Sequence, residues 1–268
     1  MLRDHYEPDD LFAKVPELAL KLDPTLAQLD TLLDDDALFN TIKADLQTRY
    51  PQTPTRGRPS TPMAVILRML VLKHLQNWSY EELEHFVADS LVLRQFCRVY
   101  LNRVPDDTVL IRWANTIQPE TLHQLHERVV QLARSVNVTR ARKLRVDSTV
   151  VETDRHPPSD SSLLAVVGDR GCWSAENERY AKQQGVKQIG LPKSGKTSEA
   201  RVKREQARWF KRLPRFRAGI EGRISVLKRK HGLRRCRDHG EAGFARWVGW
   251  GIIAGNLTVM ARTMAARG

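Results

Sequence analysis

The stretch KLRVDSTVVE, residues 143–152, alternates apolar and polar positions and is rich in β-branched residues. This two-residue period predicts a strand, because successive side chains of a strand point to opposite faces of a sheet. Two further apolar runs, AVVGD (165–169) and VKQIGLP (186–192), predict a second and a third strand. We therefore expect a small sheet in the middle of the chain.

The chain before this sheet, residues 1–137, reads as nearly all helix. The run MAVILRMLVLKHLQNW, residues 63–78, is strongly helical. Pro62 suits the first helical position, with Thr61 or Ser60 as the cap. Ahead of it, PQTPTRGRPSTP has no hydrophobic period and predicts a linker or a DNA-facing arm.

Two more helix starts are marked by capping residues. Ser79 followed by Glu82 is a capping-box pattern. Asp106 or Asp107 is suited to cap a later helix, because a short carboxylate accepts hydrogen bonds from unpaired N–H groups at a helix start.

The chain after the third predicted strand is again helical. A loop, KSGKTSEA, leads to a long basic helix that we expect Pro214 to break and Gly232 to end. A second helix forms the tail. The expected fold class is α+β, with a mostly helical N-terminal region followed by a smaller α/β core.

Charge is unevenly distributed along the 268 residues, whose net charge is +13. Residues 1–50 carry 5 Lys and Arg against 11 Asp and Glu, whereas residues 201–237 carry 15 Lys and Arg against only Glu205 and Glu221. So long a one-signed stretch favours a polyanionic partner, most readily nucleic acid, with a membrane surface as a distant second. A solvated helix face is the ordinary alternative.

Other features bound the class of protein. The three cysteines form no CxxC pair, which fits a reducing cytosol, and the acidic start lacks the apolar core of a signal peptide. The sequence contains no run of 18 apolar residues, so we expect no membrane span.

Three carboxylates stand out by position. Asp147 lies inside the first predicted strand, Asp169 ends the second, and Glu221 is the only acid in the helical stretch 215–231. A charged residue inside a strand is costly unless it is solvated, paired or bound to a metal. Each acid also has an ordinary interpretation, on a wet strand face, in a turn, or paired with a neighbouring arginine.

Helical spacing sharpens the last position. Residues 217, 221 and 228 fall within ~40° of one another around a helix, so Glu221 stands between Arg217 and Lys228. Carboxylates near cations suit Mg²⁺ and phosphate, because hard oxygen ligands hold the metal while Arg and Lys hold phosphate oxygens.

Together these motifs resemble the bacterial insertion-sequence transposases of the DDE class, which have a ribonuclease-H-like catalytic core. DSTVVE is similar to the strand of the first Asp, and GDRG to that of the second. RAGIEGRISVLK resembles the Tyr-x2-Arg-x3-Glu-x6-Lys signature, with Pro214 at the Tyr position. The helical stretch from GRPSTP to VPDDTVLIRW resembles that family's N-terminal DNA-binding domain.

This resemblance implies a set of site residues and partners. Asp147, Asp169 and Glu221 would be the catalytic residues that hold Mg²⁺ or Mn²⁺. The partners would be double-stranded DNA, as terminal inverted repeats and target, and further copies of the chain in the bacterial cytoplasm at the nucleoid. The residues expected to bind DNA are Arg217, Lys228, Arg56, Arg58, Arg223 and Arg229.

The resemblance also implies a domain division. Residues 1–50 would be an acidic helical appendage, residues 51–137 a helical DNA-binding domain, and residues 138–268 a shortened catalytic domain.

The catalytic core is short between its first two acids. Asp147 and Asp169 are only 22 positions apart, and the connector 153–164 does not look helical. A parallel crossover needs a dozen or more residues. We hypothesise that the chain is an internally deleted or naturally decayed transposase that lacks a segment after Leu164. If the first two strands instead pair antiparallel, the acids need not converge.

Three functions therefore stay open at the level of sequence. One is a DNA-cleaving and DNA-joining enzyme, and the second is a DNA-binding remnant without catalysis. The third is a basic structural or RNA-binding protein in which the three acids are coincidental.

Overall fold

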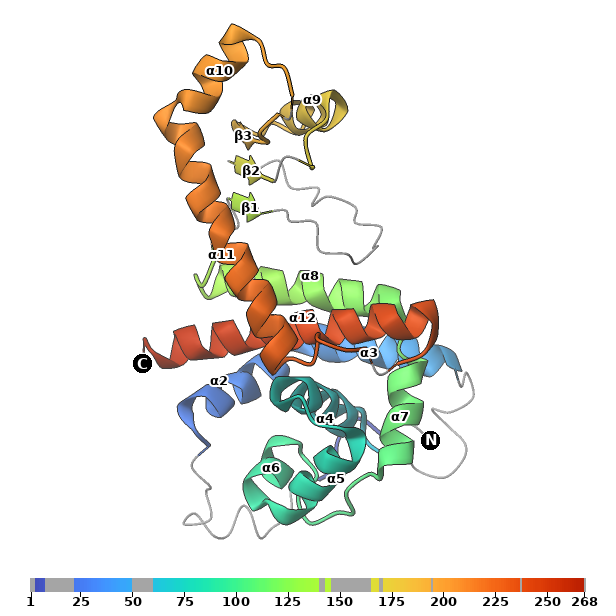
Figure 1. Ribbon diagram of the computed structural model, residues 1–268. Helices are drawn as coiled ribbons and strands as arrows, with labels where there is room; N and C mark the ends of the chain where they lie inside the picture. Colours follow the sequence, from blue (N-terminus) through green and yellow to red (C-terminus); the bar gives the residue numbers. More distant parts are fainter. Residues whose placement is uncertain are drawn as a thin grey trace. The chain divides into compact units, whose positions relative to one another are not determined.

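The computed structural model describes residues 3–7, 22–49, 60–139, 143–145, 165–168, 171–193, 195–236 and 238–267. The chain divides into two compact units. Unit 1 comprises Met1–Val138 and Leu227–Gly268, and unit 2 comprises Thr139–Val226. Unit 1 is helical in its described part, and unit 2 holds the sheet (Figure 1).

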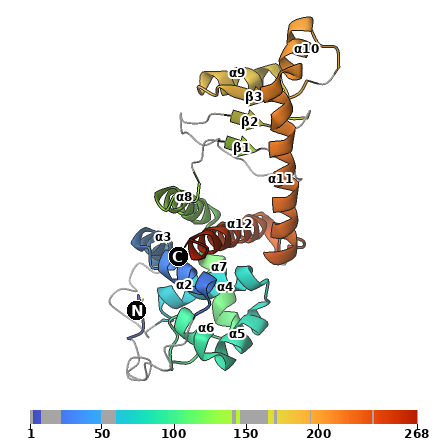
Figure 2. The ribbon, with the colours of Figure 1, turned by 90° about the vertical axis from the view of Figure 1, so that its left-hand side faces the viewer.

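In the described part of unit 1, eight helices surround one apolar core. They are α2 (Pro24–Leu33), α3 (Asp36–Arg49), α4 (Met63–Gln76), α5 (Tyr80–Asp89), α6 (Leu91–Phe96), α7 (Asp107–Thr116), α8 (Pro119–Ser135) and α12 (Gly240–Ala265). The tail helix α12 packs against α2, α4 and α8 (Figures 1 and 2). Its side chains Trp250, Leu257 and Met260 are buried in the same core as Leu70 and Phe96. The C-terminal helix thus completes unit 1.

The acidic N-terminal segment contributes side chains to this core. Leu33 and Leu46 are buried among the core residues. The acids are paired: Asp30 and Asp34 accept hydrogen bonds from the buried Arg68 at 2.5 and 2.6 Å. Charge complementarity with Arg68 therefore lets an acidic segment join an otherwise basic protein.

The start of α4 differs from the expected cap. Helix α4 begins at Met63, and Pro62 occupies the cap position without a capping side chain. Its first N–H groups are satisfied from the chain's N-terminus instead: Met63 donates to the carbonyl of Arg3 at 2.9 Å and Ala64 to that of Asp4 at 3.2 Å. Neither Thr61 nor Ser60 is needed, because distant backbone supplies the acceptors.

The other two predicted caps are confirmed. Ser79 accepts from the N–H of Glu82, and the Glu82 carboxylate accepts from the N–H of Ser79 at 2.7 Å, which completes a capping box. Asp106 caps α7 by accepting from Val109 at 2.8 Å.

Unit 2 contains a three-stranded sheet at the predicted places. The strands are β1 (Lys143–Arg145), β2 (Ala165–Val167) and β3 (Gln188–Gly190), and their order is β1-β2-β3. Both pairings are parallel, so the antiparallel alternative is wrong. The remainder of the first predicted strand, residues 146–152, lies outside the described residues.

Three helices accompany this sheet, namely α9 (Ala175–Gln183), α10 (Glu199–Gln206) and α11 (Arg208–Lys230). Helix α11 runs beside the strands (Figures 1 and 2). Its contact with the sheet is close at Gly190, where an added Cβ would lie 2.4 Å from the Leu213 side chain. A glycine at this point lets the helix approach β3 closely.

The long basic helix breaks at a different residue from the one that we expected. Ala207 has an extended backbone and separates α10 from α11, whereas α11 continues through Pro214. An interior proline removes one backbone hydrogen bond, and here the helix tolerates that loss. The predicted end is confirmed: Gly232 has φ 75° and Leu233 donates to the carbonyl of Leu227 at 3.2 Å.

Candidate catalytic and nucleic-acid-binding residues

The first two strands of unit 2 bring two chain segments into register. Lys143 pairs with Ala165 and Arg145 with Val167. The two expected catalytic aspartates follow these strands, each two positions after the last described strand residue. Asp147 and Asp169 themselves lie outside the described residues.

The third expected acid is placed by α11. Glu221 is exposed on this helix, and Lys228, seven residues on, is exposed as well. Seven residues of α-helix rise about 10 Å, so the two side chains lie two turns apart. Arg223 is half-buried, and burial lowers the pKa of its guanidinium.

Several predicted residues lack described side chains. Arg56 and Arg58 lie outside the described residues, and the side chain of Arg217 is not described although its backbone belongs to α11. Within the described ranges, no group of three His, Cys, Asp or Glu side chains is placed to hold a metal ion.

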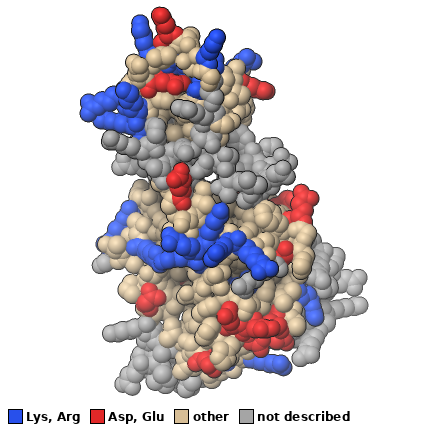
Figure 3. All heavy atoms as spheres, in the orientation of Figure 1, with Lys and Arg blue, Asp and Glu red and all other residues tan. Residues whose placement is uncertain are grey.

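A concentration of exposed cations marks the end of α11 and the turn that follows it. We call this the basic segment; it consists of Lys228, Arg229, Lys230, Arg234 and Arg235, all exposed. No acid lies between residues 222 and 237. Figure 3 shows a band of Lys and Arg across this face of unit 1. Such a surface attracts phosphate groups.

Sequence reasoning named only part of this segment. Lys228 and Arg229 were expected to bind DNA, but Lys230, Arg234 and Arg235 were not singled out. The available signal was the Arg234-Arg235 pair, two residues after the glycine that ends the helix, because a turn leaves long side chains exposed.

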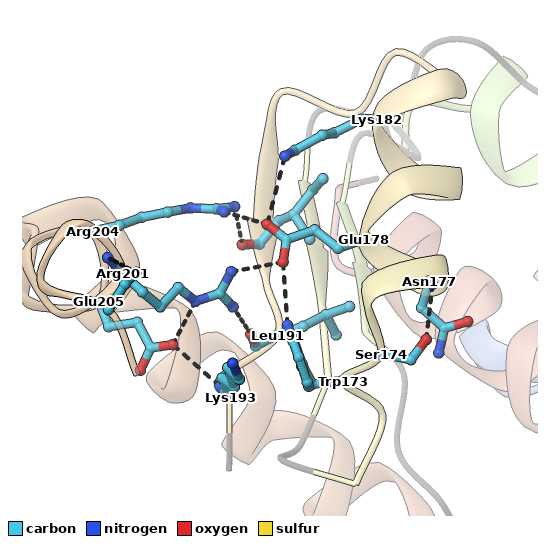
Figure 4. Close-up of polar contacts among 12 residues, drawn as sticks. Trp173, Ser174, Asn177, Glu178, Lys182, Leu191, Lys193, Arg201, Arg204 and Glu205 are labelled. Atoms are coloured by element: carbon cyan, nitrogen blue, oxygen red, sulfur yellow. Dashed lines mark hydrogen bonds and ion pairs between the residues drawn. The ribbon is translucent and has the colours of Figure 1, made fainter. Parts of the chain in front are cut away.

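A second polar cluster lies in unit 2 and was not predicted (Figure 4). Glu178 of α9 is buried and accepts hydrogen bonds from Arg201 at 2.6 Å, from Arg204, and from the Trp173 indole at 3.2 Å. Arg204 also donates to the carbonyl of Ile189 in β3 at 3.1 Å. The cluster thus ties α9 and α10 to the sheet.

The electrostatics of Glu178 define what this cluster does. Burial by itself would raise the pKa of Glu178, but the hydrogen bonds from Arg204, Arg201 and Trp173 outweigh it and lower the pKa to about 2. The carboxylate is therefore ionised at neutral pH and cannot donate a proton. Its role in the described structure is to hold elements together.

Comparison with known proteins gives two matches. Residues 14–116 match a family model described as a transposase domain (DUF772), and residues 171–261 match one described as a transposase DDE domain. The first match takes in much of the acidic N-terminal segment. The second contains Glu221 and most of α12 and begins just after Asp169.

No curated protein and no solved structure matches the chain. Within the described residues, every helix is too short or too polar to cross a membrane.

The two family matches together take in most of the chain, which therefore belongs to the transposases and carries a DDE domain.

Proposed function

We propose that this transposase-family protein binds the ends of a bacterial insertion sequence and carries out metal-dependent DNA cleavage and strand transfer. The proposal assigns it to the class with the Tyr-Arg-Glu-Lys signature, acting as a homo-oligomer. The observation that carries the proposal is the parallel, in-register pairing of β1 with β2.

The parallel pairing matters because the carboxyl ends of parallel strands lie at one edge of a sheet. Asp147 and Asp169 follow β1 and β2 by the same number of residues, so they occupy equivalent positions in the two segments. Helix α11, which carries Glu221, packs on the neighbouring strand β3 through Leu213 and Gly190. The fold of unit 2 is thus compatible with three converging carboxylates.

The chemistry of this donor set fits a divalent cation. Asp147, Asp169 and Glu221 offer only carboxylate oxygens, which are the ligands that Mg²⁺ and Mn²⁺ prefer. Bound metal would supply activation of a water or a 3′-hydroxyl and stabilisation of the leaving oxygen. Glu221 would hold the metal ion from helix α11. The DNA phosphates would be neutralised by Arg217, Arg223, Lys228 and Arg229.

The basic segment supports binding of duplex DNA, with Arg56 and Arg58 as further contacts before α4. Five exposed cations over residues 228–235 offer phosphate contacts on this surface. Such contacts release condensed counterions, so we expect affinity to fall steeply with salt.

A second candidate function is that of a DNA-binding remnant without catalysis. One observation favours it. The DDE match begins at residue 171, so it leaves out both aspartates. Internal deletion after Leu164 would remove strands of the core while leaving DNA binding in place.

A cleavage assay separates the two candidates. Supercoiled plasmid carrying the ends of the encoding element is incubated with Mg²⁺ and the full chain, or with Asp147→Ala, Glu221→Gln or the control Glu176→Gln. Glu176 is exposed on α9. The proposal predicts cleavage by the wild type and Glu176→Gln, and a large loss of rate in the other two, because each of them removes a metal ligand.

Equal and negligible cleavage by all four proteins would contradict the proposal. Retained preference for the element's ends in a binding assay would then establish the remnant. Equal binding of end DNA, random duplex and RNA would establish a basic structural or RNA-binding protein.

A further inference from the structure

Helix α7 presents two unlike faces. Leu110 and Ala114 are buried in unit 1, whereas the opposite face is exposed. The side chains on the exposed face stand three or four residues apart, so they form one stripe along the helix. They are Thr108, Ile111, Arg112 and Asn115.

The first turn of α7 is acidic, and its polar groups form hydrogen bonds. Asp106 accepts hydrogen bonds from the Val109 N–H and, at 2.7 Å, from the Thr108 hydroxyl. The N–H of Asp107 donates to Glu84 at 2.9 Å. Because three carboxylates gather there, phosphates are repelled from this end.

The second half of α7 has the opposite character. Ile111 is 38% exposed, and Arg112 and Asn115 are exposed beside it. Arg246 reaches over from α12 and donates to the Asn115 side-chain oxygen at 3.2 Å. An apolar group, an amide and two guanidinium groups thus lie together at the C-terminal half of one helix.

We propose that this half of α7 reads the base sequence of duplex DNA from the major groove. The proposal rests on the proposed binding of element ends and names the residues that discriminate between sequences. The major groove admits an α-helix, and its base edges match these side chains. Arginine pairs with guanine, asparagine with adenine, and an apolar side chain with the thymine methyl group.

The division of charge along α7 fixes how the helix approaches DNA. The acidic first turn stays away from the backbones, and the half that carries Arg112 and Asn115 enters the groove. Arg246 then has two roles. It orients Asn115 in the free protein, and in the complex it binds a flanking phosphate or base edge. Base reading is thereby separated from the basic segment, which binds phosphate without regard to sequence.

The test is a selection from a library of duplexes with a randomised central segment, performed with the full chain. Wild type is compared with Arg112→Ala and Asn115→Ala. The matched controls are Arg134→Ala and Gln124→Ala, both exposed on α8. Circular dichroism establishes that every variant is folded, and affinity for unselected duplex is measured separately at fixed salt.

We expect the wild type and both controls to enrich one sequence motif. Each α7 variant should lose preference at one or two positions of that motif, by roughly 5- to 150-fold per base pair. Affinity for unselected duplex should stay within about 2-fold.

Two results would overturn the inference. One is enrichment of no motif by a wild type that binds unselected duplex. The other is enrichment of the same motif by all variants. Failure of DNA cleavage with an intact motif would count against the proposed catalysis and leave the inference about α7 standing.

Discussion

The two units of this protein are stabilised in different ways. Unit 1 buries a large set of leucine, isoleucine, methionine and aromatic side chains in one core. In unit 2 the buried apolar cluster of the described residues is small, comprising Ala181, Val186, Ile189 and Leu191, and the ion pairs of Glu178 join the elements around it. Unit 1 should therefore respond to changes in apolar volume, and unit 2 to changes in charge.

The largest expected effect is loss of an aromatic side chain from the core of unit 1. Phe96 is fully buried, and its ring lies under Arg68, whose guanidinium carbon is 5.5 Å from the ring centroid. Phe96→Ala should lower the free energy of unfolding of unit 1 by about 3–5 kcal/mol. Urea denaturation followed by circular dichroism measures this change.

Phe86→Ala is the matched control, because Phe86 is 40% exposed. Equal losses in the two variants would show that unit 1 is not stabilised by its core as described.

A smaller effect is expected from the charge cluster of unit 2. Glu178→Gln leaves Arg201 and Arg204 beside a neutral amide and should lower the free energy of unfolding of unit 2 by about 1.5–3 kcal/mol, because charge-assisted hydrogen bonds are lost. Hydrogen–deuterium exchange should rise in peptides from residues 171–206 and not in those from α4. Glu176→Gln, on the same helix, should change neither.

The same cluster predicts a pH dependence confined to unit 2. The pKa of Glu178 is lower in the folded state than in the unfolded state, so its contribution is complete above about pH 4.5 and is lost as the pH falls towards 2. Pepsin cleavage within residues 171–206 should therefore increase over this range in the wild type and change less in Glu178→Gln. Identical pH profiles for both proteins would contradict the assignment.

Next in size is the contact between α11 and the sheet. A Cβ at Gly190 would lie 2.4 Å from the Leu213 side chain, so Gly190→Ala should push the helix from β3 at a cost of about 1–3 kcal/mol. Gly195→Ala is not a suitable control because its φ of 84° disfavours alanine. Gly222→Ala is suitable, since an added Cβ there meets nothing within 4 Å.

The readout for this pair is exchange protection of β3. Protection should fall in Gly190→Ala and stay constant or rise in Gly222→Ala. Loss of protection in both variants would show that the helix, and not its contact with Gly190, controls the strand.

The smallest expected effect is that of a helix cap in unit 1. Ser79→Ala removes the acceptor for the Glu82 N–H and should cost about 1 kcal/mol. Thermal unfolding measures the shift, and Ser135→Ala, in the last turn of α8, should shift less. A shift as large as that of Phe96→Ala would contradict this ranking, because a cap should contribute less than a buried aromatic side chain.

Much of this fold was predictable from local sequence. Alternation and apolar runs located β1, β2 and β3, and the caps at Ser79 and Asp106 marked α5 and α7. These signals are local because a strand period or a cap depends on residues within one turn or a few strand positions.

Features that depend on distant partners were missed. Arg3 caps α4 through its backbone carbonyl, Arg68 draws the acidic α2 into the core, and α12 packs into unit 1. The sequence around these residues carries no signal that identifies the distant residue or helix each one contacts. The cluster around Glu178 was missed for the same reason, since Arg201 and Arg204 lie on a later helix.

In the candidate site too, local features could be predicted from the sequence, whereas contacts between distant segments could not. Spacing within one helix was enough to select Glu221 and Lys228, and both lie on α11 as expected. Convergence of Glu221 with Asp147 and Asp169 depends on three separate elements, so it stays a prediction.

The most direct test of that convergence is binding of Mn²⁺ to the full chain, measured by electron paramagnetic resonance with a duplex bearing the element's end. Asp147→Asn, Asp169→Asn and Glu221→Gln are compared with the wild type, and Glu176→Gln serves as the control. Three gathered carboxylates predict that each of the first three variants weakens Mn²⁺ binding while the control does not. Wild-type affinity in all variants would show that the three acids do not share a metal site.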